Sequence, residues 1–306
     1  MRNKLFESNF EGCIIGGAIG DAWGSSYEYE STVDYSKTYI WGENPPEVIE
    51  REWRITDDTQ LTLATCEALC EDSYTPEKLS KYFGDYYKSK KLSGLGAGTL
   101  KALRDLDAGL HWSISGRSGE YAAGNGAAMR IAPFAFFSAI SREDVYKASI
   151  ITHKNDEAYA GALAVFLAIR AVIEKEWKGA ENLLEIIITQ LPDTKIRDRL
   201  IDIAKVSRCT TIKDISKLGN DGYVVNSVPF AIFSANQVLK IGMTRMFTEI
   251  IQAGSDTDTN SSIAGQISGA LIGINNIPEE LINKIKLLEK YGWLKEIIDR
   301  TIKKIG

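Results

Sequence analysis

The chain has 306 residues, a length that suits one large or two ordinary domains and leaves room for a substantial buried core. Hydrophobic residues make up 44% and charged residues 25%, which excludes a disordered or collagen-like chain. Because 36 Lys and Arg stand against 41 Asp and Glu, the net charge is -5, and no global positive field exists to hold nucleic acid stably. A ligand that carries phosphate must be held by local features.

The N-terminus and the cysteines indicate the compartment. The apolar stretch 13–19 is short, rich in glycine and closed by an acid, unlike a signal peptide, and no window approaches the roughly 20 apolar residues of a membrane span. Four cysteines are too few and too scattered to stabilise a chain of this length by disulfide bonds, which fits a reducing compartment. Cys66 and Cys70 lie one helical turn apart, but with only His111 and His153 elsewhere, buried small hydrophobes are a better interpretation than zinc ligands. We expect a cytoplasmic monomer without membrane contact.

Helical periodicity predicts an all-α fold. Apolar residues recur at helical spacing in segments 61–69, 163–170 and 281–294. Proline followed by acids at 76–77 and 278–280 predicts two helix starts, because proline and acids suit the first turn.

Segments without helical periodicity are expected to be loops. The best alternating run, 223–228, lies in a region rich in Gly, Asn and Asp and is interpreted as part of a loop. Long loops are predicted near residues 29–55, 88–98, 111–127 and 207–227. Because no Ser/Gly linker or sharp shift in composition divides the chain, we predict one compact domain over residues 1–306.

Glycine recurs at every fourth position in two predicted helices. The two sets are Gly12, Gly16, Gly20 and Gly24, and Gly265, Gly269 and Gly273. A glycine in a helix interior costs about 1 kcal/mol relative to alanine, so each stripe indicates close backbone approach between helices. Close packing alone explains the stripes, and so does packing that brings acids at the helix ends together.

Two clusters of Thr and Asp open two predicted helices, at 56–59 and 256–259, while Asp21 and Glu28 stand beside the first glycine stripe. Capping explains one such residue per helix, since Asp and Thr are preferred caps. Several carboxylates in each short segment repel one another unless a cation neutralises them. Oxygen ligands of this kind select Mg²⁺, Mn²⁺ or Ca²⁺. If the clusters meet, their side chains would hold two cations.

Two glycine-rich segments are candidates for phosphate recognition. Segment 124–130, GNGAAMR, places small residues before an apolar stretch and so exposes backbone N–H groups, although it lacks the Lys-Ser/Thr ending of a P-loop. Segment 94–99, GLGAGT, is similar, and either one is equally an ordinary turn. His153 precedes a predicted helix, where it is either a donor to a ligand or a structural histidine.

Taken in order, six segments resemble the ADP-ribosylglycohydrolase family, the group that contains dinitrogenase-reductase-activating glycohydrolase and the ADP-ribosyl-acceptor hydrolases. The segments are GGAIGDAWGSSYEYE, TDDTQLTLA, GLGAGTLKAL, GNGAAMRIAP, THKNDEAYAGA and GSDTDTNSSIAGQISGALIG. They cover the chain from about Gly12 to Gly273 in family order. The resemblance implies a single all-α domain whose cleft holds two Mg²⁺ or Mn²⁺ ions.

The resemblance also implies site residues. It assigns metal ligands to Glu28, Thr56, Asp57, Asp58, Asp256, Asp258 and Thr259. It implies catalytic roles for Glu28, Asp57 and Asp258, and Glu28 lies in the context Gly-Ser-x-Tyr-Glu of hydrolases that cleave O-linked ADP-ribose.

The ligand-binding residues follow from the same resemblance. The loop that cradles the diphosphate corresponds to Tyr121, Ala122, Ala123, Gly124, Asn125 and Gly126, and His153 corresponds to a ligand-contacting histidine. Two departures stand out: Ser255 replaces a family glycine, and Ala122 with Ala123 replaces a more polar pair.

The implied function is hydrolysis of the bond between the ribose C1″ of ADP-ribose and an acceptor, with an ADP-ribosylated protein or other ADP-ribose conjugate as substrate. Two cations would orient the ribose 2″ and 3″ hydroxyls while a carboxylate transfers a proton. The acceptor stays open between arginine, serine, another side chain, a nucleic-acid base and an O-acetyl group. The alternatives are a catalytically silent ADP-ribose-binding or structural protein, and a metal-dependent nucleotide phosphohydrolase.

Overall fold

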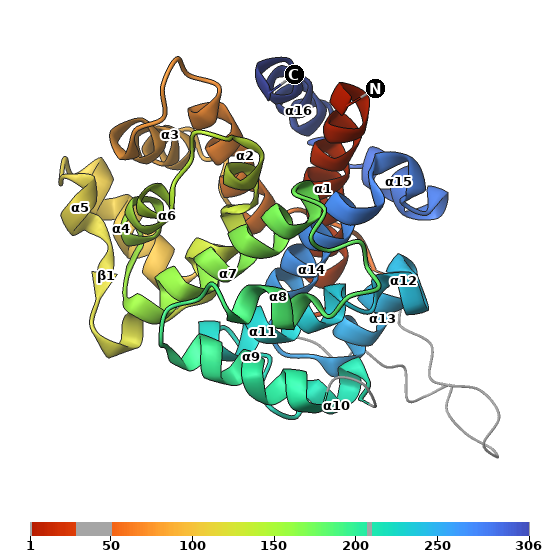
Figure 1. The fold of residues 1–306 in the computed structure, drawn as a ribbon. Helices are drawn as coiled ribbons and strands as arrows, with labels where there is room; N and C mark the ends of the chain where they lie inside the picture. The colour runs from red at the N-terminus through yellow and green to blue at the C-terminus, as the bar shows by residue number, and fades with distance from the viewer. Residues whose placement is uncertain (1, 29–50, 207–209, 306) are drawn as a thin grey trace.

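Two helices from opposite ends of the chain lie against each other at the centre of the fold (Figure 1). They are α1 (Arg2–Gly24) and α14 (Thr257–Ile272). The structure, a computed structural model, describes residues 2–28, 51–206 and 210–305.

The regular structure of the described residues is almost entirely helical, which confirms the all-α prediction. The other α-helices are α2 (Asp57–Leu69), α3 (Pro76–Lys88), α4 (Ala97–Asp107), α5 (Trp112–Ser115), α6 (Arg142–Ile150), α7 (Asp156–Ile173), α8 (Leu183–Ile188), α9 (Lys195–Val206), α10 (Ile212–Ser216), α11 (Val224–Ala235), α12 (Val238–Ile241), α13 (Met243–Ala253), α15 (Glu279–Lys286) and α16 (Tyr291–Ile305). The 3₁₀ segments are η1 (Glu120–Ala122), η2 (Asn125–Arg130), η3 (Ala132–Phe136) and η5 (Ile274–Asn276). Two short strands, β1 (Arg117–Ser118) and β2 (His153–Lys154), pair in parallel.

The glycine stripes are the contact surface between α1 and α14. A Cβ atom built on Gly12, Gly16, Gly20 or Gly24 would lie 2.3, 2.4, 2.2 or 2.3 Å from the carbonyl oxygen of Gly269, Gly265, Ser261 or Thr257, respectively. Contacts this short leave no room for a side chain, so the two backbones touch directly. The residue pairs also show that the helices run antiparallel, which places the end of α1 beside the start of α14.

The predicted helix starts are confirmed. Thr75 caps α3 by accepting a hydrogen bond from the N–H of Lys78, and Pro76 occupies the first turn. Helix α15 begins at Glu279, directly after Pro278. The apolar segments 61–69 and 163–170 lie in α2 and α7, and 281–294 is divided between α15 and α16.

The interpretation of 223–228 as part of a loop is wrong, because Val224 begins α11. The residues of this helix from Val224 to Ala235 are buried apart from Asn226. A helix surrounded by other helices needs no polar face, so its sequence lacks the amphipathic period that identifies surface helices. Its run of β-branched valines then imitates a strand.

Most predicted loops are only partly irregular. The loop 88–98 is present between α3 and α4, but 111–127 also contains α5, β1, η1 and the start of η2. The segment 210–223 contains α10, because Thr211 and Asp214 form a capping box at its start. Residues 29–50 and 207–209, which complete the other predicted loops, lie outside the described residues.

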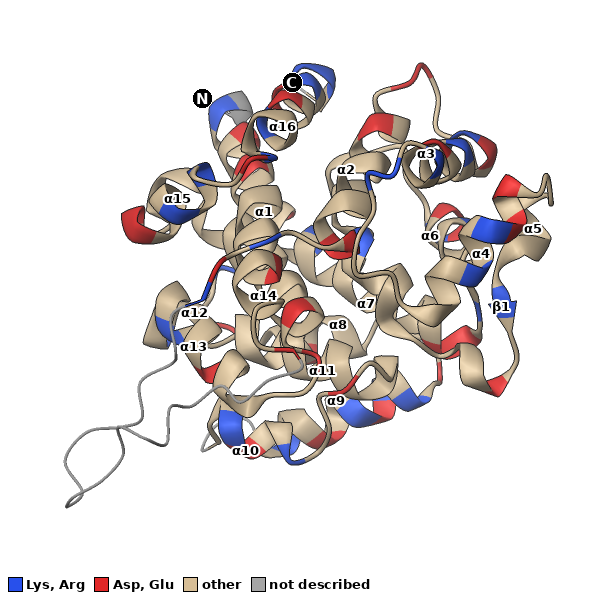
Figure 2. Ribbon diagram, turned by 180° about the vertical axis from the view of Figure 1, so that it is seen from behind, with Lys and Arg blue, Asp and Glu red and all other residues tan. Residues whose placement is uncertain are grey.

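Charge is concentrated on the outer helices, as Figure 2 shows for α9, α10 and α16. Helix α11 carries no charged residue, and α14 carries only Asp258. An acid inside so apolar a core therefore requires a specific explanation. Among the residues described, no helix has the length and apolar character needed to cross a bilayer.

The contact between α1 and α14 generates a stability prediction with a matched control. We expect Gly265→Ala to lower the free energy of unfolding by about 1–3 kcal/mol, because its Cβ would lie 2.2 Å from the Gly16 carbonyl oxygen. The same change at Gly84, inside α3, meets no atom of the described residues within 4 Å and should stabilise the protein by up to about 1 kcal/mol through helix propensity. Urea unfolding of both variants measures the difference, and equal effects would contradict the packing argument.

Candidate active site

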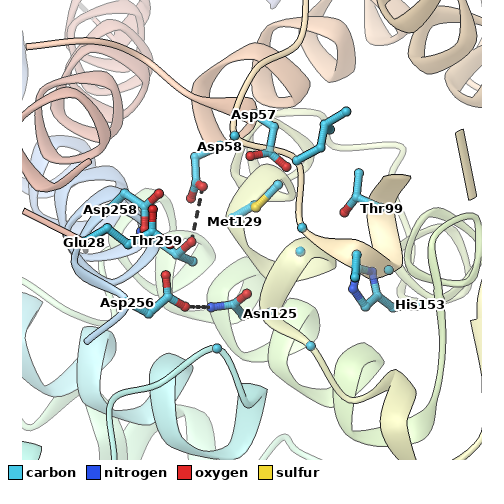
Figure 3. Close-up of a pocket in the computed structure, with 18 of the residues that line it drawn as sticks. Glu28, Asp57, Asp58, Thr99, Asn125, Met129, His153, Asp256, Asp258 and Thr259 are labelled. Atoms are coloured by element: carbon cyan, nitrogen blue, oxygen red, sulfur yellow. Dashed lines mark hydrogen bonds between the residues drawn. The ribbon is translucent and has the colours of Figure 1, made fainter. Parts of the chain in front are cut away.

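The two acidic clusters lie next to each other, as Figure 3 shows. Asp57 and Asp58 occupy the first turn of α2, whereas Asp256 occupies the N-cap position of α14 and Asp258 lies in its first turn. The Thr259 hydroxyl donates a hydrogen bond to Asp58 Oδ2 over 3.2 Å, although the two residues are 201 positions apart. The two clusters therefore meet in space. They meet where the antiparallel contact places the end of α1 beside the start of α14.

The carboxylates form two groups with one shared member. Oxygens of Asp21, Asp58 and Asp258 lie within 4.8 Å of one another, as do oxygens of Glu28, Asp256 and Asp258. The first group is buried, while Glu28 and Asp256 in the second are half-buried. Both arrangements suit a cation with oxygen ligands, since three acids in such proximity repel one another without one.

The electrostatics also fit a cation. Burial raises the pKa of Asp57, Asp58 and Asp258 well above the ordinary value, and neighbouring aspartates raise it further. Among the residues that the structure describes, the buried Asp58 Oδ1 atom has no hydrogen-bond partner. A carboxylate oxygen left unpaired in a protein interior is costly, and a bound cation removes that cost. The buried aspartates can therefore hold a metal ion.

Asp21 is part of this centre, although the sequence-based ligand set omits it. Its carboxylate is fully buried and accepts hydrogen bonds from the backbone N–H and hydroxyl groups of both Thr56 and Thr59. Burial raises the pKa of Asp21, and these hydrogen bonds oppose the increase. The sequence signal was an acid inside the apolar, glycine-striped helix α1, where a charge needs several partners. Asp21 thus joins α1 to the start of α2.

Thr56 and Thr259 differ in their positions. The Thr56 hydroxyl caps α2 by accepting from the N–H of Asp58 over 3.4 Å, and it donates to Asp21 Oδ1 over 2.7 Å. Thr56 does not line the adjacent cavity, whereas Thr259 does. Thr56 is therefore already engaged in holding the helix start.

A cavity of about 560 Å³ extends from the acids toward His153. Its lining is Glu28, Asp57, Asp58, Gly94, Leu95, Gly96, Ala97, Gly98, Thr99, Arg117, Tyr121, Gly124, Asn125, Gly126, Met129, His153, Gly222, Ser255, Asp256, Asp258 and Thr259. The volume falls in the range of small-molecule sites. One end is thus strongly acidic, and the other is formed by glycine-rich backbone.

The predicted diphosphate loop only partly faces this cavity. Tyr121, Gly124, Asn125 and Gly126 line it, but Ala122 and Ala123 are buried and do not. Ala123 instead accepts a backbone hydrogen bond from Val224. This tie holds the loop against the start of α11.

The glycine-rich loop also contacts the acidic end directly. The Asn125 side-chain amide donates to Asp256 Oδ2 over 2.6 Å, and the Asn125 backbone N–H donates to the Gly222 carbonyl over 3.3 Å. The buried Arg130, at the end of η2, donates to the Gly126 carbonyl of the same loop. The position of the loop is therefore coupled to the position of Asp256.

His153 lies at the opposite end, packed against three glycines. A Cβ atom on Gly98, Gly124 or Gly126 would lie 2.9, 3.0 or 2.7 Å from the nearest imidazole atom. Burial lowers the pKa of His153 to about 3, and the cations Arg130 and Arg117 contribute. The ring is therefore neutral at physiological pH.

Several lining residues were not assigned from the sequence. The segment 94–99, which its glycine-rich composition had indicated only as a candidate phosphate loop or an ordinary turn, lines the cavity with all of its residues. Met129 belongs to segment 124–130, the other candidate for phosphate recognition. Arg117 and Gly222 have no such local signal, because they come from separate segments that only folding brings together.

The relationship to known proteins follows from comparison of sequence and fold. A sequence profile described as ADP-ribosylglycohydrolase matches residues 2–306. The chain belongs to the ADP-ribosylglycohydrolase family. A solved structure titled "ADP-ribosylglycohydrolase-related protein complex" superposes with a TM-score of 0.73 at 20% identity, over 99% of this chain and 100% of that one. That likeness supports the all-α fold of the family.

Named relatives within the ADP-ribosylglycohydrolases are distant. The ADP-ribosylhydrolase ARH3 of Homo sapiens is 26% identical, over 97% of this chain and 94% of the human protein. The ADP-ribosylarginine hydrolase Tri1 of Pseudomonas putida is 25% identical, over 95% of this chain and 78% of that protein.

The raised aspartate pKa values predict an unusual pH dependence of stability in this member of the ADP-ribosylglycohydrolase family when no metal is bound. Between the unfolded and folded pKa values the native state binds more protons, so stability falls as the pH rises through that interval. We expect Asp58→Asn to stabilise the metal-free protein at pH 7 and to have less effect at pH 4. Thermal melts in chelator measure this effect.

Asp214 supplies a control of opposite sign. Hydrogen bonds from Lys217 and Thr211 lower the pKa of this surface acid to about 2, so Asp214→Asn should destabilise the protein at pH 7. Adding Mn²⁺ at pH 7 should raise the melting temperature of the wild type more than that of Asp58→Asn. Destabilisation of the metal-free protein by Asp58→Asn at pH 7 would contradict the repulsion between the acids.

Proposed function

We propose that the protein is a divalent-cation-dependent hydrolase that cleaves the C1″ glycosidic bond of ADP-ribosylated substrates and releases ADP-ribose. The observation that carries the proposal is one cavity with two carboxylate groups at one end and glycine-rich loops with His153 at the other. Membership of the ADP-ribosylglycohydrolase family and the names of the relatives ARH3 and Tri1 support the same reaction.

The proposed metal ligands are the oxygen-bearing residues at the acidic end. Asp57, Asp58, Asp256, Asp258, Thr259 and Glu28 line the cavity, and Thr56, which directly precedes Asp57, completes the set without lining it. The unpaired Asp58 Oδ1 and the grouping of carboxylates fit hard cations. Two Mg²⁺ or Mn²⁺ ions bound there would supply Lewis-acid charge that orients the ribose hydroxyls.

The other end of the cavity would hold the diphosphate. Helix α4 begins at Ala97, and no side chain of the described residues caps it, so its first backbone N–H groups are available to an anion in the cavity. Arg117 adds a positive charge to the same cavity. An elongated ligand with phosphate at one end and ribose hydroxyls at the other matches this polarity.

Glu28 is the proposed proton-transfer group. It lines the cavity, is half-buried and belongs to the carboxylate group that contains Asp256 and Asp258. A carboxylate at this position would assist departure of the acceptor or activation of water at C1″. The resemblance of the context Gly24–Glu28 to the hydrolases of O-linked ADP-ribose favours a serine-type linkage as the substrate class.

A substrate panel tests the proposed reaction. Serine-linked, arginine-linked, nucleic-acid-linked and O-acetyl ADP-ribose should be incubated with the protein in Mg²⁺, in Mn²⁺ and after exhaustive chelation. We expect free ADP-ribose from the serine-linked substrate, loss of the activity on chelation and recovery on adding metal.

The products distinguish the competing functions. AMP or inorganic phosphate would identify a nucleotide phosphohydrolase instead. ADP-ribose binding without turnover of any linkage would identify a silent binding protein, and full activity in a protein shown to be free of metal would exclude the cation-dependent mechanism.

Glu28→Gln tests the proton-transfer role. The change keeps the size of the side chain and removes a group whose contribution is typically about 10²–10⁴-fold in turnover. We expect that loss in single-turnover assays, with ADP-ribose affinity by calorimetry close to wild type. The matched control is Glu52→Gln, an exposed glutamate outside this cavity, which should leave turnover unchanged. Glu28→Gln turnover within a few-fold of wild type would reject the assignment.

A further inference from the structure

Three buried residues are joined by a series of two hydrogen bonds that ends at the cavity. Arg130 Nη2 lies 2.9 Å from Thr152 Oγ1, and Thr152 Oγ1 lies 2.9 Å from His153 Nδ1. Arg130 is 2% exposed, Thr152 0% and His153 6%. Because water does not reach Thr152, protein groups must supply the hydrogen-bond partners of its hydroxyl.

The direction of the first hydrogen bond is fixed. A guanidinium carries only donors, so Arg130 donates to Thr152. Other contacts hold Arg130 in place. It donates to the carbonyls of Gly126 and Ala148, and its guanidinium lies 4.8 Å from the centre of the Phe83 ring. Thr152 therefore always acts as an acceptor toward Arg130.

The direction of the second hydrogen bond follows from the hydroxyl proton. Within the described part of the chain, the Thr152 hydroxyl has no acceptor other than His153 Nδ1. If Nδ1 carried a proton, the hydroxyl would accept twice and its own proton would be buried without a partner, which is unfavourable. If Nδ1 is unprotonated, it accepts the hydroxyl proton, and every donor and acceptor in the two hydrogen bonds has a partner. The neutral ring then carries its proton on Nε2.

We propose that Thr152, held by Arg130, is a positioning residue that keeps His153 in the Nε2–H tautomer, so that this N–H donates to an anionic oxygen of the ligand. The Nε2 atom lies at the cavity wall, where a Cβ on Gly98 or Gly124 would come within 2.9 or 3.0 Å of it. The buried Arg130 and the cavity-lining Arg117 favour negative charge at the same place. The ligand part of this inference rests on the proposed function, whereas the tautomer does not.

Nitrogen NMR of the histidine rings tests the tautomer directly in the free protein. The chain has only His111 and His153, and His111→Gln, a change of an exposed side chain, assigns the two sets of signals. We expect the wild-type His153 ring to be neutral and protonated at Nε2. A ring protonated at Nδ1 would overturn the proposal, whatever ligand the protein binds.

Thr152→Val and Thr152→Ser separate the hydroxyl from the shape of the side chain. The valine variant removes the donor to Nδ1, so the ring should shift toward Nδ1–H and the Kd for ADP-ribose should rise roughly 10- to 100-fold, as for loss of a hydrogen bond to a charged group. The serine variant keeps the hydroxyl and should retain both the tautomer and the affinity. An unchanged tautomer in folded Thr152→Val would overturn the positioning role.

The two proposals fail in different ways. A wild-type ring in the Nε2–H form together with no binding of ADP-ribose would count against the proposed function and leave the tautomer assignment supported. A shifted tautomer in Thr152→Val with unchanged ADP-ribose affinity would overturn the donation from His153 to the ligand. If Thr152→Val fails to fold, the wild-type tautomer and the Thr152→Ser variant still decide the assignment.

Discussion

The contact between α1 and α14 is the constraint on which the acidic centre depends. The glycine faces of the two antiparallel helices bring their backbones into direct contact. The last turn of α1 therefore lies beside the first turn of α14. The Thr257 hydroxyl donates to the Gly24 carbonyl over 2.7 Å and closes this end of the contact. Glu28, which follows α1, and Asp258, at the start of α14, are thereby brought into one carboxylate group. A larger side chain in the stripe would separate the helices and with them the acids.

Asp21 extends the same constraint to a third helix. Its hydrogen bonds to Thr56 and Thr59 hold the start of α2 against α1, so Asp58 reaches the carboxylates of the other two helices. The cost of this arrangement is buried negative charge, expressed in the raised pKa values of Asp57, Asp58 and Asp258. Stability is given up locally to gather carboxylates in a group that can hold a cation.

A buried arginine, Arg130, holds together the opposite end of the cavity. Arg130 donates to Gly126, in the glycine-rich loop, and to Thr152, which contacts His153. Asn125, one residue before Gly126, donates to Asp256 at the acidic end. The loop is thus fixed from both sides, which places its glycine-rich backbone and the carboxylates at a set distance from one another. Such preorganisation lowers the conformational cost of holding an extended ligand.

The sequence by itself determined the all-α fold, the helix starts, the two acidic clusters and the glycine stripes, because these are local patterns of period, capping and composition. It misassigned 223–228, since a helix buried on every side carries no amphipathic period. Only the tertiary structure decided that Asp21 joins the acids, that Ala122 and Ala123 do not line the cavity, and that the buried Arg130 donates to the loop. These properties depend on contacts between residues far apart in the chain, and such contacts leave no local pattern in a single sequence.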